Sequence, residues 1–75
     1  MEIFKKRLKE TVEEQGITAY KISKDLNISV SLVSYWINGT VLPGIEHFKK
    51  LCQYLDVSSD YLLGLEDYAG VKNNN

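Results

Sequence analysis

The chain has 75 residues, of which 44% are hydrophobic and 25% are charged. This composition fits one small globular domain and excludes the low hydrophobicity of disordered chains. No apolar run approaches the ~18 residues of a membrane span, and the start MEIFKKRLKE lacks the apolar stretch of a secretory signal, so a cytoplasmic protein without a membrane segment is expected. The single cysteine, Cys52, excludes an internal disulfide framework and a cysteine-based zinc finger.

The formal net charge of −1 is unevenly distributed along the chain. Residues 1–50 hold eight Lys and Arg against six Asp and Glu, a balance of +2. Residues 51–75 hold one Lys against four Asp and Glu, a balance of −3. An acidic chain argues against a nucleic-acid binder, but the first two thirds of this one can still present a mildly positive face.

Two helices are predicted at the start of the chain, because apolar residues recur there at helical spacing without a long alternation at period two. The first helix ends near Gln15–Gly16, since glycine accepts the left-handed conformation that closes a helix. Thr18 is the expected N-cap of the second helix, and Asn27, which tolerates positive φ, ends it. The residues predicted to point inward are Phe4, Leu8, Val12, Ile22 and Leu26.

Three further helices are predicted downstream. Ser29 caps the third helix, which covers residues 29–37 and stops at Asn38-Gly39. The fourth follows Pro43-Gly44, and Ser58 caps a short fifth helix that ends at a glycine. The inward stripe of the fourth helix is predicted to be Ile45, Phe48, Cys52 and Leu55.

Residues 18–39 have the pattern of a helix-turn-helix, with two short helices joined by a connection around Asn27–Ser29. The small side chain of Ser23 lets the first of these helices cross close beneath the second. When the third helix of the chain, over residues 29–37, is drawn on a wheel at 100° per residue, Val33 and Ile37 point inward. Its outward residues are short or flat, none is acidic, and they suggest a surface that becomes covered: Val30 at the rim, Ser31, Ser34, Tyr35 and Asn38.

On these residues the sequence resembles the Cro/cI-type (XRE) helix-turn-helix repressors. The matching motifs follow in the correct order as R-L-K-E (7–10), E-Q-G-I-T (14–18), Y-K-I-S (20–23), I-S-V-S-L-V-S-Y-W-I-N-G (28–39), Pro43, I-E-x-F-x-K-L (45–51) and V-S-S-D-Y-L-L-G (57–64). The resemblance covers about four fifths of the chain. It implies an all-α, compact five-helix, lambda-repressor-like DNA-binding domain without catalytic activity or cofactor.

The resemblance also implies that the helix at 29–37 reads the major groove of double-stranded DNA. The residues at base-reading positions are Val30, Ser31 and Tyr35, with Ser34 as a neighbour. The residues at phosphate-contacting positions are Thr18, Ala19, Asn38 and Thr40. Serine can pair with a donor or an acceptor on a base edge, and a valine can pack on a thymine methyl. On the second helix, Lys21 and Lys24 are expected to add electrostatic attraction.

Four residues depart from the family pattern. Ala19 stands where glutamine is frequent, and Thr40 stands where a basic residue is common, so both positions lose a polar or charged side chain. Val12 and Ile37 replace a frequent arginine–glutamate pair, and we predict that these two side chains touch. Apolar packing in place of a buried ion pair is often neutral or stabilising.

Plainer interpretations remain open for several residues. The outward face of the third helix can be merely solvated, and the basic residues of the first helix can either bind phosphate or form an ordinary outer face: Lys5, Lys6, Arg7 and Lys9. Trp36 is expected to anchor the edge of the core rather than to stack on a base. His47 and Cys52 lie about 140° apart on one helix, which argues against a shared metal ion. No acid–base pair, nucleophile motif or glycine-rich phosphate loop indicates an enzyme.

The sequence therefore predicts a sequence-specific transcriptional regulator, expected to be a repressor of the prophage or mobile-element type, with no small-molecule ligand. Residues 1–65 are predicted to form the DNA-binding domain, and residues 66–75 a tail that is partly disordered or part of a dimer contact. A homodimer on a palindromic site is preferred, through apolar residues of the C-terminal third that otherwise form a loose tail: Leu63, Leu65, Tyr68 and Val71. The alternative is a protein-interaction module on the same scaffold, antitoxin-like or partner-holding, with weak or no DNA binding, which the low positive charge favours.

Overall fold

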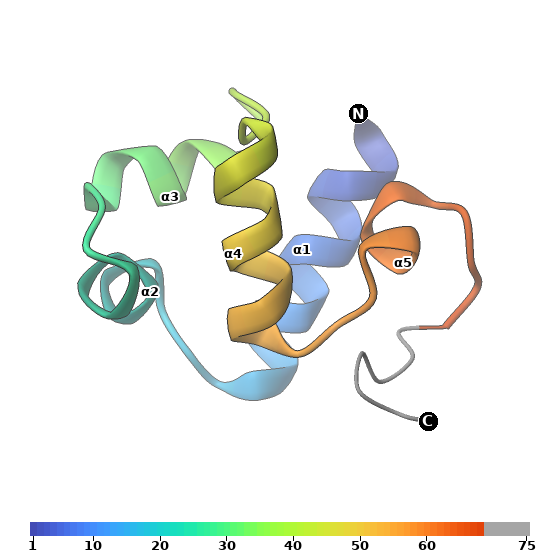
Figure 1. Cartoon of the computed structure of the whole chain (residues 1–75), viewed down its shortest axis with the longest axis horizontal. Helices are drawn as coiled ribbons and strands as arrows, with labels where there is room; N and C mark the ends of the chain where they lie inside the picture. Colours follow the sequence, from blue (N-terminus) through green and yellow to red (C-terminus); the bar gives the residue numbers. More distant parts are fainter. Residues whose placement is uncertain (69–75) are drawn as a thin grey trace.

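The computed structural model describes residues 1–68, which form five α-helices and no strand (Figure 1). The helices are α1 (Glu2–Gln15), α2 (Ala19–Leu26), α3 (Val30–Asn38), α4 (Ile45–Leu55) and α5 (Ser59–Leu63). The predicted all-α class and the order of five helices are confirmed, and α3 runs one residue beyond its predicted end at Ile37. Val71 lies outside the described residues. Within residues 1–68, no helix is long and apolar enough to cross a membrane.

Side-chain caps fix where the helices begin. Thr18, Ser29 and Ser58 each accept a backbone N–H from the first turn of the following helix, at 3.0–3.3 Å, as predicted. Asn27 (φ 58°) closes α2 in the left-handed conformation that its residue type favours. Asp56 (φ 57°) closes α4 in the same way, at an end for which no closing residue is predicted.

One apolar core joins the helices. α1 packs against both α3 and α5, and α2 packs against α3, while α4 contributes three buried residues to the same core. The core cluster is Phe4, Leu8, Val12, Ile22, Val33, Trp36, Leu51, Cys52, Leu55, Val57 and Leu62. Trp36 is only 1% exposed, so it lies inside the core and not at the edge that the sequence predicts. Ile37 packs against the cluster that contains Val12, and direct contact between these two side chains stays a prediction.

The predicted inward stripe of α4 is wrong at Ile45. Cys52 and Leu55 are buried and Phe48 packs against the core, but Ile45 is 84% exposed. It is the first residue of α4, where the helix passes the limit of the core, so this side of the first turn borders solvent. Leu51, which the predicted stripe omits, is fully buried.

Arg7 is a structural residue that fastens the end of the domain to α1. Its Nη1 donates hydrogen bonds to the carbonyl oxygens of Tyr61 at 2.7 Å and Glu66 at 2.5 Å. Its guanidinium also lies 4.4 Å from the centroid of the Tyr61 ring. Ser58 Oγ donates to Glu66 Oε1 at 3.3 Å. The segment as far as Glu66 is therefore held against the body of the domain.

Candidate nucleic-acid interface

The turn between α2 and α3 fixes the two helices relative to each other. The N–H groups of Asn27 and Ile28 donate to the carbonyl oxygens of Lys24 and Ser23, at 3.3 and 3.0 Å, and so close α2. Ser23 itself is buried, as its predicted place at the helix crossing requires, and its hydroxyl donates to the Tyr20 carbonyl at 2.7 Å. α2 and α3 therefore form the predicted helix-turn-helix.

The outer face of α3 carries no charged side chain. Val30, Ser31 and Asn38 are exposed, Tyr35 is 47% exposed, and Ser34 is half-buried between this face and the body. Hydroxyl, phenol and amide groups can pair with base edges, and the valine can pack on a thymine methyl. Together these side chains form a polar but uncharged ridge, which we call the α3 outer face.

Thr18 and Ala19 lie at the N-terminus of α2. The first N–H groups of a helix lack intrahelical acceptors, so a helix start attracts anions such as phosphate. Thr18 Oγ1 accepts the Lys21 N–H at 3.1 Å, and its hydroxyl proton can still be donated to a phosphate oxygen. Ala19 is half-buried and offers only its backbone N–H.

Lys21 is engaged by an acidic neighbour. Its Nζ lies 2.9 Å from Asp25 Oδ2, and the same oxygen accepts a hydrogen bond from the hydroxyl of Tyr54 on α4. The Tyr54 and Lys21 hydrogen bonds lower the pKa of Asp25, and the hydrogen bond to Asp25 raises the pKa of Lys21. The charge of Lys21 is thus partly neutralised within the chain.

Lys24 and Tyr20 form a second exposed group on α2. The Nζ of Lys24 lies 5.7 Å from the centroid of the Tyr20 ring, and Tyr20 is 62% exposed. Tyr20 is not among the residues predicted from the sequence. A signal for it exists, because two residues turn a helix by about 200°, which sets Tyr20 opposite the buried Ile22.

The basic residues of α1 have different surroundings in the fold. Lys6 pairs with Glu10 at 3.6 Å, and the guanidinium of Arg7 donates hydrogen bonds to the carbonyl oxygens of Tyr61 and Glu66. The stem of Lys5 lies across Gly39, where an added Cβ would stand only 2.5 Å from Lys5 Cδ. Since Gly39 ends α3 and precedes Thr40, the fold brings Lys5 to the α3 end of the interface.

His47 and Cys52 have structural positions. The His47 ring lies 5.3 Å from the Trp36 ring, centroid to centroid, and Cys52 is buried in the core as predicted. Within residues 1–68, no group of His, Cys, Asp and Glu side chains is arranged to hold a metal ion.

A comparison with protein families identifies the class to which this chain belongs. A helix-turn-helix family model, HTH_3, matches residues 8–62, roughly three quarters of the chain, including all of α2 and α3. The chain belongs to the Cro/cI-type (XRE) helix-turn-helix family of DNA-binding regulators. Comparison with curated proteins and with solved structures found no match to the chain.

Proposed function

We propose that this DNA-binding regulator recognises a specific duplex sequence with the α3 outer face and represses transcription from that site. Val30, Ser31 and Tyr35 face the bases of the major groove, with Ser34 beside them. The observation that carries this proposal is the exposed, uncharged α3 outer face on a helix-turn-helix. A face that only needed solvation would favour Lys and Glu, whereas hydroxyl and amide groups supply base contacts.

Phosphate contacts are proposed to come from the edges of this face. Nonspecific affinity for DNA depends on neutralising phosphates, and α3 contributes no cation to that process. The residues assigned to the phosphates on either side of the groove are Thr18, Ala19, Lys21, Lys24, Asn38, Thr40 and Lys5. Of the two lysines on α2, Lys24 carries the larger share, because Asp25 partly neutralises Lys21.

The regulator is proposed to act in the cytoplasm as a homodimer on a palindromic site. Two recognition helices related by a two-fold axis and ~34 Å apart reach successive major grooves on one side of the duplex. We propose a repressor of the prophage or mobile-element type, as the resemblance of the sequence to Cro/cI-type repressors implies.

Selection of bound duplexes from a random pool, followed by fluorescence anisotropy across a salt series, tests this function. Ser31→Ala and Tyr35→Ala should relax the preference at individual base pairs by about 1–3 kcal/mol. Lys24→Ala should weaken all sequences alike and reduce the salt slope by about one. Ser59→Ala, which removes an exposed serine from the first turn of α5, is the matched control and should change neither.

Two results would contradict the proposal. One is a selection that enriches no sequence. The other is binding that is insensitive to salt, together with capture of one stoichiometric protein partner, which would favour the interaction module with weak or no DNA binding. Reporter transcription from the selected site separates repression from activation.

A further inference from the structure

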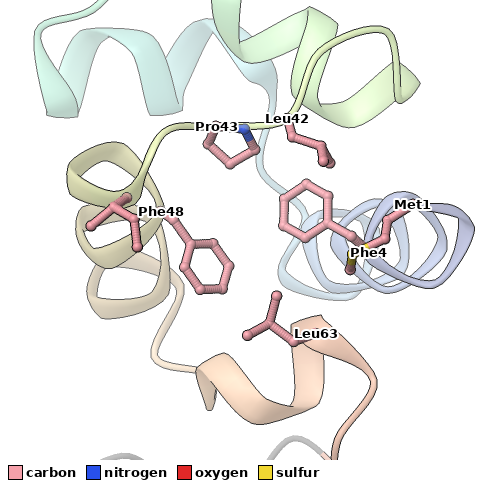
Figure 2. Close-up of a pocket in the computed structure, with 7 residues that line it drawn as sticks. Met1, Phe4, Leu42, Pro43, Phe48 and Leu63 are labelled. Atoms are coloured by element: carbon pink, nitrogen blue, oxygen red, sulfur yellow. The ribbon is translucent and has the colours of Figure 1, made fainter.

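An apolar hollow of about 210 Å³ opens beside the connection between α3 and α4. Figure 2 shows Phe4 and Phe48 extending toward it from α1 and α4, with Leu42 and Leu63 at opposite sides. The two phenylalanine rings lie 6.0 Å apart, centroid to centroid. The lining residues, all apolar, are Met1, Phe4, Leu42, Pro43, Ile45, Phe48 and Leu63.

The rim of this hollow is exposed. Ile45 is 84% exposed, and Met1, Leu42 and Leu63 are each exposed as well. Soluble monomers rarely leave large contiguous apolar patches in water, and such patches commonly mark an interaction surface. We call the hollow and these rim residues the apolar groove.

We propose that the apolar groove seats a second copy of this chain, and that each copy inserts Ile45 into the hollow of the other. A two-fold contact uses the same patch on both partners, so the patch must carry a protrusion and a receptor together. Ile45 is the protrusion, and it stands at the edge of the receptor. The hollow exceeds the ~150 Å³ of an apolar cavity that holds benzene, so the four-carbon side chain of Ile45 fits.

The composition of the chain argues against its own C-terminal residues as the occupant. Residues 69–75, AGVKNNN, contain Val71 as their only large apolar side chain, next to a lysine and three asparagines. Such a segment cannot match a surface lined by seven apolar residues. A second copy supplies the same apolar groove and matches it.

The position of the groove suits the proposed function, whose homodimer this inference refines. Leu42 and Pro43 of the connection between α3 and α4 line the groove. The starts of α1 and α4 lie along the same edge of the molecule (Figure 1). A two-fold axis at the groove therefore fixes the spacing of the two α3 helices. This differs from the sequence-based preference for the C-terminal third, because only Leu63 belongs to both sets.

The surface available sets the expected strength. A standard interface takes ~800 Å² from each partner, about one sixth of the 4895 Å² that this chain exposes. The apolar groove supplies the centre of such an interface, so we expect a dimer that dissociates in the micromolar range and is completed on DNA.

Sedimentation equilibrium from 1 to 500 µM is the test, with wild type, Ile45→Asp and Leu65→Asp compared. Leu65 is an exposed leucine of the C-terminal third outside the groove, so the same substitution there is the matched control. Each dimer contains two Ile45 side chains, and the loss of each from the partner's hollow should weaken dimerisation about tenfold. Ile45→Asp should therefore raise the dimer dissociation constant about a hundredfold or more. Leu65→Asp should change it less than threefold. Far-UV circular dichroism should stay unchanged for both variants.

A DNA measurement separates this proposal from the proposed function. Ile45→Asp should bind an isolated half-site like wild type but lose cooperative binding to the full palindrome. A wild-type chain that stays monomeric at 500 µM and binds the palindrome without cooperativity would overturn the dimer. Disruption by Leu65→Asp with no effect of Ile45→Asp would overturn the groove as its surface. Loss of half-site binding by every form would instead contradict the DNA-reading role.

Discussion

Replacing Arg7 with alanine should lower the free energy of unfolding by about 2 kcal/mol. The Arg7 Nη1 donates to the carbonyl oxygens of Tyr61 and Glu66, at 2.7 and 2.5 Å. Hydrogen bonds from a charged donor contribute about 1.5–3 kcal/mol, and the lower end applies to the pair because water reaches this half-buried site. The stacking of the guanidinium on the Tyr61 ring, 4.4 Å away, adds about 0.5–1 kcal/mol.

Urea and thermal unfolding, followed by far-UV circular dichroism, measure this loss. In a domain of this size 1 kcal/mol corresponds to about 4–8 °C, so Tm should fall by about 8–16 °C. The Leu65 N–H, which donates to the Asp60 carbonyl at 2.7 Å, should also exchange its hydrogen faster. Lys6→Ala is the matched control, since the pair of Lys6 with Glu10 is exposed and its loss should change stability by less than ~0.5 kcal/mol.

The opposite outcome has a clear meaning. If Arg7→Ala unfolds within ~0.5 kcal/mol of wild type but binds DNA more weakly with a flatter salt slope, Arg7 belongs to a phosphate-binding surface. The structural role assigned to it from the Tyr61 and Glu66 contacts would then be wrong.

Three further predictions concern α2. Asp25→Asn releases Lys21 from its 2.9 Å pair, so anisotropy should show tighter DNA binding with a salt slope steeper by about 0.9, and Lys21→Ala in the same background should cancel this gain. Asn27→Ala should cost about 1 kcal/mol in urea unfolding because φ is 58°, whereas Asn27→Gly should lose less than half of that. Tyr54→Phe removes the hydrogen bond that contributes most to the lowered pKa of Asp25, so the NMR titration midpoint of the Asp25 carboxyl should rise. A carboxyl whose pKa is lower in the folded than in the unfolded chain stabilises the fold at pH values above its unfolded pKa. The difference in unfolding free energy between wild type and Tyr54→Phe should therefore shrink as the pH falls through the folded-state pKa of Asp25.

The helix ends were predictable because their chemistry is local. Thr18, Ser29 and Ser58 bond to N–H groups two or three residues away, and Asn27 closes α2 through its own backbone preference. The outer face of α3 follows equally well from its period, since a helix that buries Val33 must turn Tyr35 away.

Side chains whose partners are distant in sequence were not predictable in the same way. Arg7 binds carbonyl groups 54 and 59 residues further along the chain, and the local pattern, which places it beside the buried stripe of α1, does not identify these partners. Ile45 has the correct period for the core, but periodicity does not reveal where along a helix the core ends. The pair of Lys21 with Asp25 is local, at i and i+4, but the Tyr54 hydroxyl that also binds Asp25 comes from α4, so this second partner appears only in the folded chain.

The absence of cations from α3 bears on how many molecules a cell would need. A genome offers on the order of 10⁶–10⁹ competing sites of arbitrary sequence, and attachment to them is almost wholly coulombic. A regulator with few lysines near the groove leaves those sites quickly, so only a small share of its population is sequestered on the chromosome. A low copy number then suffices to keep one specific site occupied.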